Sequence, residues 1–351
     1  MSFSEYGIRL KGNKNKFFSA INATIDWVPI EKDINKVYKK GRSATGRSSY
    51  SGLLLFKMLL IQTWYNLSDT GVEEMLNDSL SAMNFCGLTL EDEVPDHSTL
   101  SRFRSELIKK KGLERLLRKV NKQLEQKNLK LKSGAARIDA TITETDRKPK
   151  GDKQWETIAT DDREEDEQSD KQEQQNQKIK AIEKKQPGVD QEARWVKKRG
   201  KLYYGYKRSI LTDDDGLIET VHTTSANEHD NKAIEPLLKK TGKKKLKDGL
   251  YGDKGYFGKN HDKTLEKYEV KNRIQKKAVK GKPLTKWEKL YNKLISKKRY
   301  VVERTFGSMV RWFGAGKAKY IGLAKTHGQH IIEAIAHNLY RIIGQVRQYH
   351  T

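Results

Sequence analysis

The spacing of apolar residues changes at Gly134, and this change constrains the fold more than any other feature of the sequence. Before it, apolar residues recur at helical spacing and are densest in Ser51–Leu67, a run too short for a membrane span and typical of a buried core helix. After it, residues 136–143 alternate apolar and polar side chains, as in a half-buried strand. The sequence therefore predicts an α+β chain, with an all-helical domain at 1–133 and a sheet-containing domain at 134–351.

Short polar side chains mark where further helices begin in the amino-terminal part. Ser68 or Asp69 can cap a second helix, and Asp96 or Ser98 can cap a third. Residues 113–131 follow with leucines at helical spacing and complete the predicted helical domain.

The third of these helices carries two arginines, Arg102 and Arg104, which its apolar stripe leaves outside. Two short helices followed by an arginine-bearing helix are compatible with a helix-turn-helix unit that reads DNA. In the other interpretation the arginines pair with nearby acids such as Glu106 on a solvated face. The sequence leaves both interpretations open.

The charge balance favours a polyanionic partner. The 351 residues include 71 Lys and Arg against 46 Asp and Glu, a formal net charge of +25, which predicts an extended positive field. We therefore expect nucleic acid as the partner and no membrane; a merely basic protein, such as a ribosomal one, is the alternative. The single cysteine, Cys86, excludes an internal disulfide and a cysteine zinc site, and residues 1–10 lack the apolar core of a signal peptide. We expect a cytoplasmic protein.

Residues 146–193 differ in composition from the rest of the chain and predict a charged insertion. Within them, residues 161–185 contain almost no apolar side chains, so they bury too little surface to offset their ordering entropy. The sequence predicts that this stretch is flexible or forms a solvent-exposed helix. An acidic segment that competes with DNA for a basic groove is the alternative.

Two aspartates accompany predicted strands. Asp139 lies on the polar face of the first strand, and Asp253 follows a short strand that runs into a glycine-rich turn. Between them, residues 202–211 and 217–223 flank an Asp-Asp-Asp-Gly turn and predict a β-hairpin. Because strand ends are where α/β folds place ligands and catalytic groups, both aspartates are candidate functional residues.

A third acid lies on a long predicted helix, whose apolar stripe runs from Trp287 to Phe313. Glu303 is on the flank of this stripe, with Arg299 one turn earlier. The plain interpretation is an i,i+4 ion pair worth a few tenths of a kcal/mol. In the functional interpretation, Glu303 reaches the edge of the sheet.

Short motifs in a fixed order connect these candidates. They lie at residues 94–104, 137–141, 203–207, 226–230, 251–256 and 302–306. The series resembles the transposases of bacterial insertion-sequence family five, which have an RNase H-like mixed-sheet catalytic core and an Asp-Asp-Glu (DDE) triad. The resemblance covers the chain from about residue 52 to residue 313. The resemblance implies that Asp139, Asp253 and Glu303 are the catalytic, metal-binding triad.

A related pattern, that of insertion-sequence family four, places a tyrosine, an arginine and a lysine around the glutamate. Arg299 matches the arginine. Ser296 and Val310 stand at the tyrosine and lysine positions, so those two roles are not assigned.

The resemblance further implies metal-dependent cleavage at transposon ends and transfer of the freed 3′ ends into target DNA. Two Mg²⁺ ions, for which Mn²⁺ would substitute, suit this chemistry because Mg²⁺ prefers hard oxygen ligands. A homodimer or larger synaptic complex follows from the need to hold two DNA ends, and a nucleoid-associated bacterial protein is expected. A nuclease of this fold without joining activity and a catalytically inactive DNA-binding protein are the alternatives.

Basic side chains on the core and on the helical domain are expected to contact DNA. Lysine-rich segments at 239–247 and 273–282 can line a path for phosphates, which gives affinity without sequence information. His222 and His229 are possible metal ligands, although a structural role is favoured for both. The residues predicted to bind DNA are Arg102, Arg104, Lys207, Arg208, Lys254, Arg299, Arg304 and Arg311.

Overall fold

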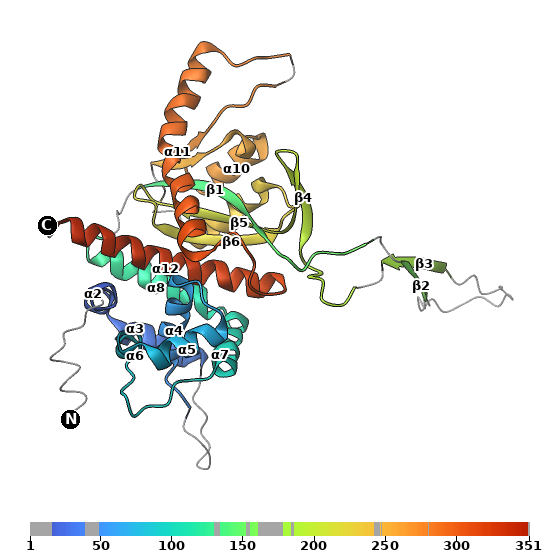
Figure 1. The fold of residues 1–351 in the computed structure, drawn as a ribbon. Coiled ribbons are helices and arrows are strands. Elements are labelled where there is room, and N and C mark those ends of the chain that lie inside the picture. Colours follow the sequence, from blue (N-terminus) through green and yellow to red (C-terminus); the bar gives the residue numbers. More distant parts are fainter. Residues whose placement is uncertain are drawn as a thin grey trace, which may run out of the picture.

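A mixed six-stranded sheet forms the centre of the carboxy-terminal part, as the computed structural model shows (Figure 1). Its strands are β1 (Ala135–Glu144), β4 (Arg194–Lys198), β5 (Lys201–Thr212), β6 (Ile218–Ser225), β7 (Gly249–Gly252) and β8 (Asn272–Ile274). The order is β4-β5-β1-β7-β8, and β6 pairs with β5. β1 is antiparallel to β5 and parallel to β7, so the predicted RNase H-like mixed sheet of an α+β fold is confirmed.

The structure describes the following parts of the chain: 16–38, 49–129, 134–151, 155–160, 178–183, 186–241, 246, 248–279 and 281–349.

Helices cover both faces of the sheet. On one face lie α11 (Lys286–Phe313) and α12 (Leu323–Tyr349). Short 3₁₀ turns and two helices lie on the other side of the sheet: η1 (Asp230–Ala233), α9 (Ile234–Thr241), η3 (Lys254–Tyr256) and α10 (Lys259–Lys267). The sequence predicted a half-buried strand at β1, but Thr143 on its polar face is fully buried and hydrogen-bonded to His330 of α12.

Seven helices of the amino-terminal part are described: α2 (Lys16–Thr24), α3 (Trp27–Val37), α4 (Gly52–Trp64), α5 (Asp69–Asp78), α6 (Leu80–Cys86), α7 (His97–Lys109) and α8 (Gly112–Gln126). The predicted caps are confirmed, because Ser68 accepts a hydrogen bond from the backbone of α5 and Asp96 does so for α7. The predicted core helix is confirmed as well, since all residues of α4 except Leu53 are buried.

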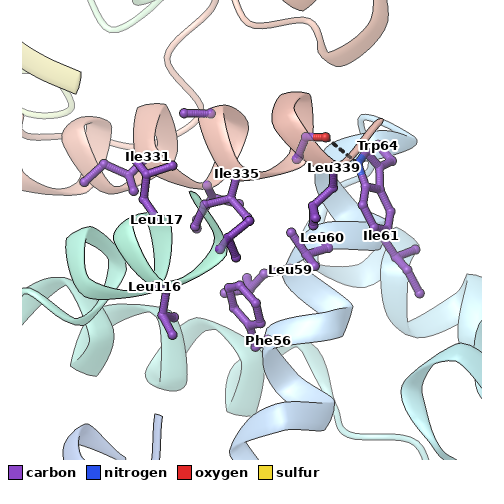
Figure 2. Close-up of a cluster of buried hydrophobic side chains, with 14 of the residues drawn as sticks. Phe56, Leu59, Leu60, Ile61, Trp64, Leu116, Leu117, Ile331, Ile335 and Leu339 are labelled. Atoms are coloured by element: carbon purple, nitrogen blue, oxygen red, sulfur yellow. Dashed lines mark hydrogen bonds between the residues drawn. The ribbon is translucent and has the colours of Figure 1, made fainter. Parts of the chain in front are cut away.

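The helical part and the carboxy-terminal helix share one hydrophobic core. Figure 2 shows Phe56 and Leu60 of α4, Leu117 of α8 and Ile335 of α12 in this cluster. The Trp64 indole also donates a hydrogen bond to a backbone carbonyl of α12, at 3.0 Å. α12 therefore lies between the sheet and the amino-terminal helices (Figure 1). The boundary at 133/134 marks a change from helix to strand, and the division into two functional domains stays a prediction.

Part of the charged insertion is a β-hairpin. β2 (Trp155–Thr160) pairs antiparallel with β3 (Lys178–Glu183) and projects away from the sheet (Figure 1). The helical interpretation of 161–185 is therefore wrong for 178–183, while 161–177 lies outside the described residues. Among the helices that the structure describes, none is long and apolar enough to cross a membrane.

Candidate active site

Two adjacent parallel strands bring Asp139 and Asp253 together. Arg137 of β1 pairs with Tyr251 of β7. Asp139 comes two residues after Arg137 and Asp253 two residues after Tyr251, so the two aspartates stand at matching positions. Neighbouring strands lie about 4.8 Å apart, which makes the two aspartates neighbours although 114 residues separate them. Asp253 directly follows β7, caps η3 and accepts a hydrogen bond from the backbone N–H of Gly255.

Helix α11 is anchored to the same strand by Arg137, a residue to which the sequence assigned no role. Its buried guanidinium donates to the backbone carbonyl of Lys298 at 2.7 Å and forms an ion pair with Asp214. Arg137 is two residues from Asp139, and Lys298 precedes Arg299. This contact therefore fixes the part of α11 that faces Asp139.

Arg299 connects two of the three predicted acids. Its Nη2 lies 3.4 Å from Oδ2 of Asp139 and 3.7 Å from Oε1 of Glu303. The side chain of Arg299 is 9% exposed, whereas that of Glu303 is 58% exposed. The i,i+4 pair expected for Arg299 and Glu303 is therefore present, and its guanidinium also reaches the sheet.

The carboxyl of Asp139 has a strongly shifted pKa. Burial raises it to about 6, and the negative charges of Asp253 and Glu303 add to the rise. The Arg299 guanidinium and the backbone N–H of Ala140 act in the opposite direction. Asp253 and Glu303 are therefore close enough to act on the ionisation of Asp139.

The donor set suits a hard divalent cation, because it consists of carboxylate oxygens that repel one another without a metal. An orphaned polar atom lies nearby, because the buried hydroxyl of Tyr256 has no hydrogen-bond partner among the residues that the structure describes. Burial raises the pKa of Tyr256, and the charges of Asp139, Asp230 and Asp253 add to the rise. Nevertheless, no three His, Cys, Asp or Glu side chains within the described ranges are already grouped to hold a metal. A metal would therefore require the exposed Glu303 side chain to turn toward the aspartates.

Four of the residues predicted to bind DNA are exposed. These are Arg102, Lys254, Arg304 and Arg311. Arg102 donates to the hydroxyl of Thr99 at 3.1 Å, and Glu106 pairs with Lys110 instead. The interpretation in which Arg102 forms an ion pair with Glu106 is therefore wrong.

Arg104 was predicted to lie outside, and this is wrong. It is 4% exposed, both of its terminal nitrogens donate to Asp69, and its guanidinium lies 4.3 Å from the ring centroid of Tyr320. This arrangement could not be predicted from the sequence, because Asp69 and Tyr320 are far from Arg104 along the chain. A buried guanidinium paired in this way cannot reach a phosphate.

Arg208 requires the same correction. It is 1% exposed and forms an ion pair with Glu333 of α12 inside the protein, so it does not line a path for phosphates. Lys207 is largely buried too, and its ammonium lies 2.8 Å from Asp230. In the lysine-rich segment 239–247, Lys240 donates to the carbonyl of Val221, while 242–245 and 247 lie outside the described residues.

The two histidines considered as ligands have other surroundings. Burial lowers the pKa of His222 to about 4, with Lys240 and His327 adding to the effect. His229 caps η1, where its ring accepts from the backbone N–H of Asn231 at 3.5 Å.

Comparisons with known proteins decide the family. Residues 8–106 match a family described as a transposase domain, DUF772, and residues 138–339 match the transposase DDE domain. The chain belongs to the DDE transposases. It is 36% identical over 239 residues to the transposase for insertion sequence element IS1106 of Neisseria meningitidis serogroup B, covering 68% of this chain and 75% of that protein. No solved structure matches it.

Membership of the DDE transposases confirms the predicted resemblance and the predicted activity class. The transposase is an enzyme that cleaves and transfers DNA with the help of divalent metal ions. The DDE match begins at Ile138 and ends within α12, so it includes all three predicted acids.

Proposed function

We propose that Asp139, Asp253 and Glu303 are the catalytic triad of this transposase and hold Mg²⁺, with Mn²⁺ as a substitute. The observation that carries the proposal is the juxtaposition of Asp139 on β1 with Asp253, which directly follows the adjacent parallel strand β7. The contact of α11 with the same strand, through Arg299, supports the inclusion of Glu303.

The residue types fit phosphodiester chemistry. Cleavage and strand transfer are in-line displacements by a water or a 3′ hydroxyl. Asp139, Asp253 and Glu303 would hold divalent ions, which would supply positive charge to the attacking and leaving oxygens. The carboxylates of the triad are hard oxygen ligands for such ions. Arg137 positions α11 and Arg299 neutralises part of the negative charge, so both keep the acids close together.

DNA contacts belong to the side chains that reach solvent. Arg304 and Arg311 lie on α11, the helix of Glu303, and Lys254 follows Asp253 directly, so these three can hold phosphates near the triad. Arg102 on α7 is our candidate for recognition of the transposon end by the helical domain, 1–133.

The further properties follow from the reaction. The transposase would act on double-stranded transposon ends and target DNA as a homodimer or larger synaptic complex, since two ends must be joined. We place it in the bacterial cytoplasm, associated with the nucleoid. A nuclease without joining activity is the second candidate, because phosphodiester hydrolysis requires the same carboxylates.

The test compares the Asp139→Asn variant with the unaltered protein on labelled DNA that carries the ends of its element. We expect cleavage to be lost while DNA binding is kept, because the substitution removes a metal ligand and leaves the exposed arginines in place. Precleaved ends then separate the two candidates: a transposase joins them to target DNA, whereas a nuclease does not. Cleavage that survives in Asp139→Asn would contradict the proposed triad.

A further inference from the structure

The hairpin of β4 and β5 extends beyond the end of β1. The last residue of β1, Glu144, pairs with Gly205, and β5 continues from there to Lys201, where it pairs with β4 (Figure 1). The two strands are joined by Arg199 and Gly200, which have φ of 50° and 82°. A two-residue turn with both φ positive matches the twist of paired strands, so this is a tight and well-defined hairpin tip.

The base of the hairpin is fixed to the protein. Tyr204 and Tyr206 are buried with Ala193, and their hydroxyls donate to the backbone and side chain of Asp190 at 2.7 Å. At Gly205 a Cβ would lie 2.2 Å from the carbonyl oxygen of Thr143, so only glycine allows the two strands to approach this closely. The hairpin therefore leaves the sheet in a fixed direction.

The tip carries a concentrated positive charge. Lys197, Lys198, Arg199 and Lys201 are all exposed, and no carboxylate of the described residues lies within ion-pair distance of any of them. Apolar side chains accompany them, since Leu202 is 63% exposed and Trp195 is 44% exposed. Four cations in five residues without a carboxylate partner in the described part of the chain are not accounted for by ion pairs there.

The tip borders a groove that it shares with β1. Lys198 and Arg199 line a groove of about 340 Å³ together with Thr141 of β1. Thr141 is two residues from Asp139 on the same face of the strand, a distance of about 7 Å along it. Glu144, the carboxylate in this groove, is paired with Lys317 at 3.3 Å, which limits its repulsion of an anion.

We propose that Lys197, Lys198, Arg199 and Lys201 hold the phosphate backbone of a DNA duplex beside the candidate active site. The inference rests on the proposed function only in placing Asp139 at the reacting phosphate. DNA is the occupant that the charge favours, because its phosphates repeat at short intervals and match a row of cations. The hairpin is also a two-stranded ribbon, a shape that the major groove accommodates. These residues position the duplex and do not touch the reacting atoms.

The experiment compares two triple variants of the full-length protein with equal loss of charge. The test variant is Lys197→Gln, Lys198→Gln and Lys201→Gln. The control is Lys263→Gln, Lys267→Gln and Lys271→Gln, three exposed lysines in or beside α10, on the face of the sheet opposite α11 and α12. Binding to a fluorescently labelled duplex of random sequence is measured without metal over a series of salt concentrations. Thermal unfolding of both variants checks the fold.

We expect the hairpin variant to bind more weakly and to lose about 2 to 3 from the slope of log K against log salt, because each phosphate contact contributes about 0.9. The control variant should keep nearly the full slope. Equal losses in both variants, or an unchanged slope in the hairpin variant, would overturn the proposal. Because no metal is present, the result is independent of whether Asp139, Asp253 and Glu303 are catalytic. Should the hairpin variant unfold, the single change Lys198→Glu replaces it, with Lys263→Glu as its control.

Discussion

Two buried arginines on the same side of the sheet have very different surroundings. Arg208 and Glu333 are 1% and 2% exposed, and each has a further partner: Arg208 donates to the carbonyl of Ala315, and Glu333 accepts from Gln329. Arg299 contacts its two carboxylates only at 3.4 and 3.7 Å, and one of them, Glu303, is 58% exposed. The Nε of both arginines has no hydrogen-bond partner among the described residues, so the two arginines differ in their carboxylates. A close ion pair between two buried groups holds the fold, whereas a loosely paired arginine between acids near solvent belongs to a site.

The largest effect should come from breaking the buried ion pair of Arg208 and Glu333. Arg208→Met leaves the carboxylate of Glu333 buried without its partner, which should lower the free energy of unfolding by about 3 to 5 kcal/mol. Arg299→Met should lower the free energy of unfolding by less than half of this amount, because Glu303 is exposed to water. Urea unfolding measures the free energy for both variants. Equal losses of stability would contradict the distinction between the two arginines.

A second effect concerns Asp139 and depends on pH. Its pKa in the folded protein is raised to about 6, so between pH 4 and 6 the folded state binds more protons than the unfolded state. Stability should therefore fall as pH rises through this window. Asp139→Asn removes the unfavourable ionisation of the buried carboxyl. The variant should therefore be more stable than the unaltered protein by about 1 to 3 kcal/mol at pH 7, and this difference should disappear below about pH 4. The comparison is thermal unfolding at several pH values; a variant less stable at pH 7 would show that Asp139 is a satisfied structural residue, as Glu333 is.

Divalent metal should produce the next effect. Millimolar Mg²⁺ binds the folded carboxylates and should stabilise the protein by about 1 to 2 kcal/mol, which raises the melting temperature. The Asp139→Asn variant provides the control and should respond little. An unchanged melting curve for the unaltered protein would count against a metal site between β1, β7 and α11.

The smallest effect on stability should come from the exposed Arg102. Arg102→Ala should change the free energy of unfolding by less than about 0.5 kcal/mol, since the partners of its guanidinium within the described segments are hydroxyl groups. The same change should weaken discrimination between transposon-end DNA and random DNA, measured by competition binding. Unaltered discrimination would refute the role of Arg102 in end recognition. Arg104→Ala, which breaks a buried pair, should destabilise the protein instead.

Local patterns were enough for much of the fold. The starts of α5 and α7, the buried helix α4 and the hairpin of β5 and β6 follow from capping side chains, periodicity and turn residues close together in sequence. The three acids could be singled out because each has an unusual position on its element, and the resemblance to transposases linked them.

Long-range contacts could not be predicted in this way. The spacing of Arg104 marks it as a surface residue, and only Asp69 and Tyr320, which approach it in three dimensions, account for its burial. The same holds for Arg208 with Glu333 and for Arg137, whose partners lie on α11 and in the β5–β6 turn. The core shared by α4, α8 and α12 also depends on a helix at the far end of the chain.

The central claim is that β1, β7 and α11 bring Asp139, Asp253 and Glu303 to one metal site, and a crystal structure with Mn²⁺ tests it most directly. We predict anomalous density at the carboxylates of Asp139 and Asp253, with Glu303 turned toward the metal and Arg299 moved away from Asp139. Mn²⁺ bound elsewhere, with the Arg299 contact to Asp139 unchanged, would contradict the claim.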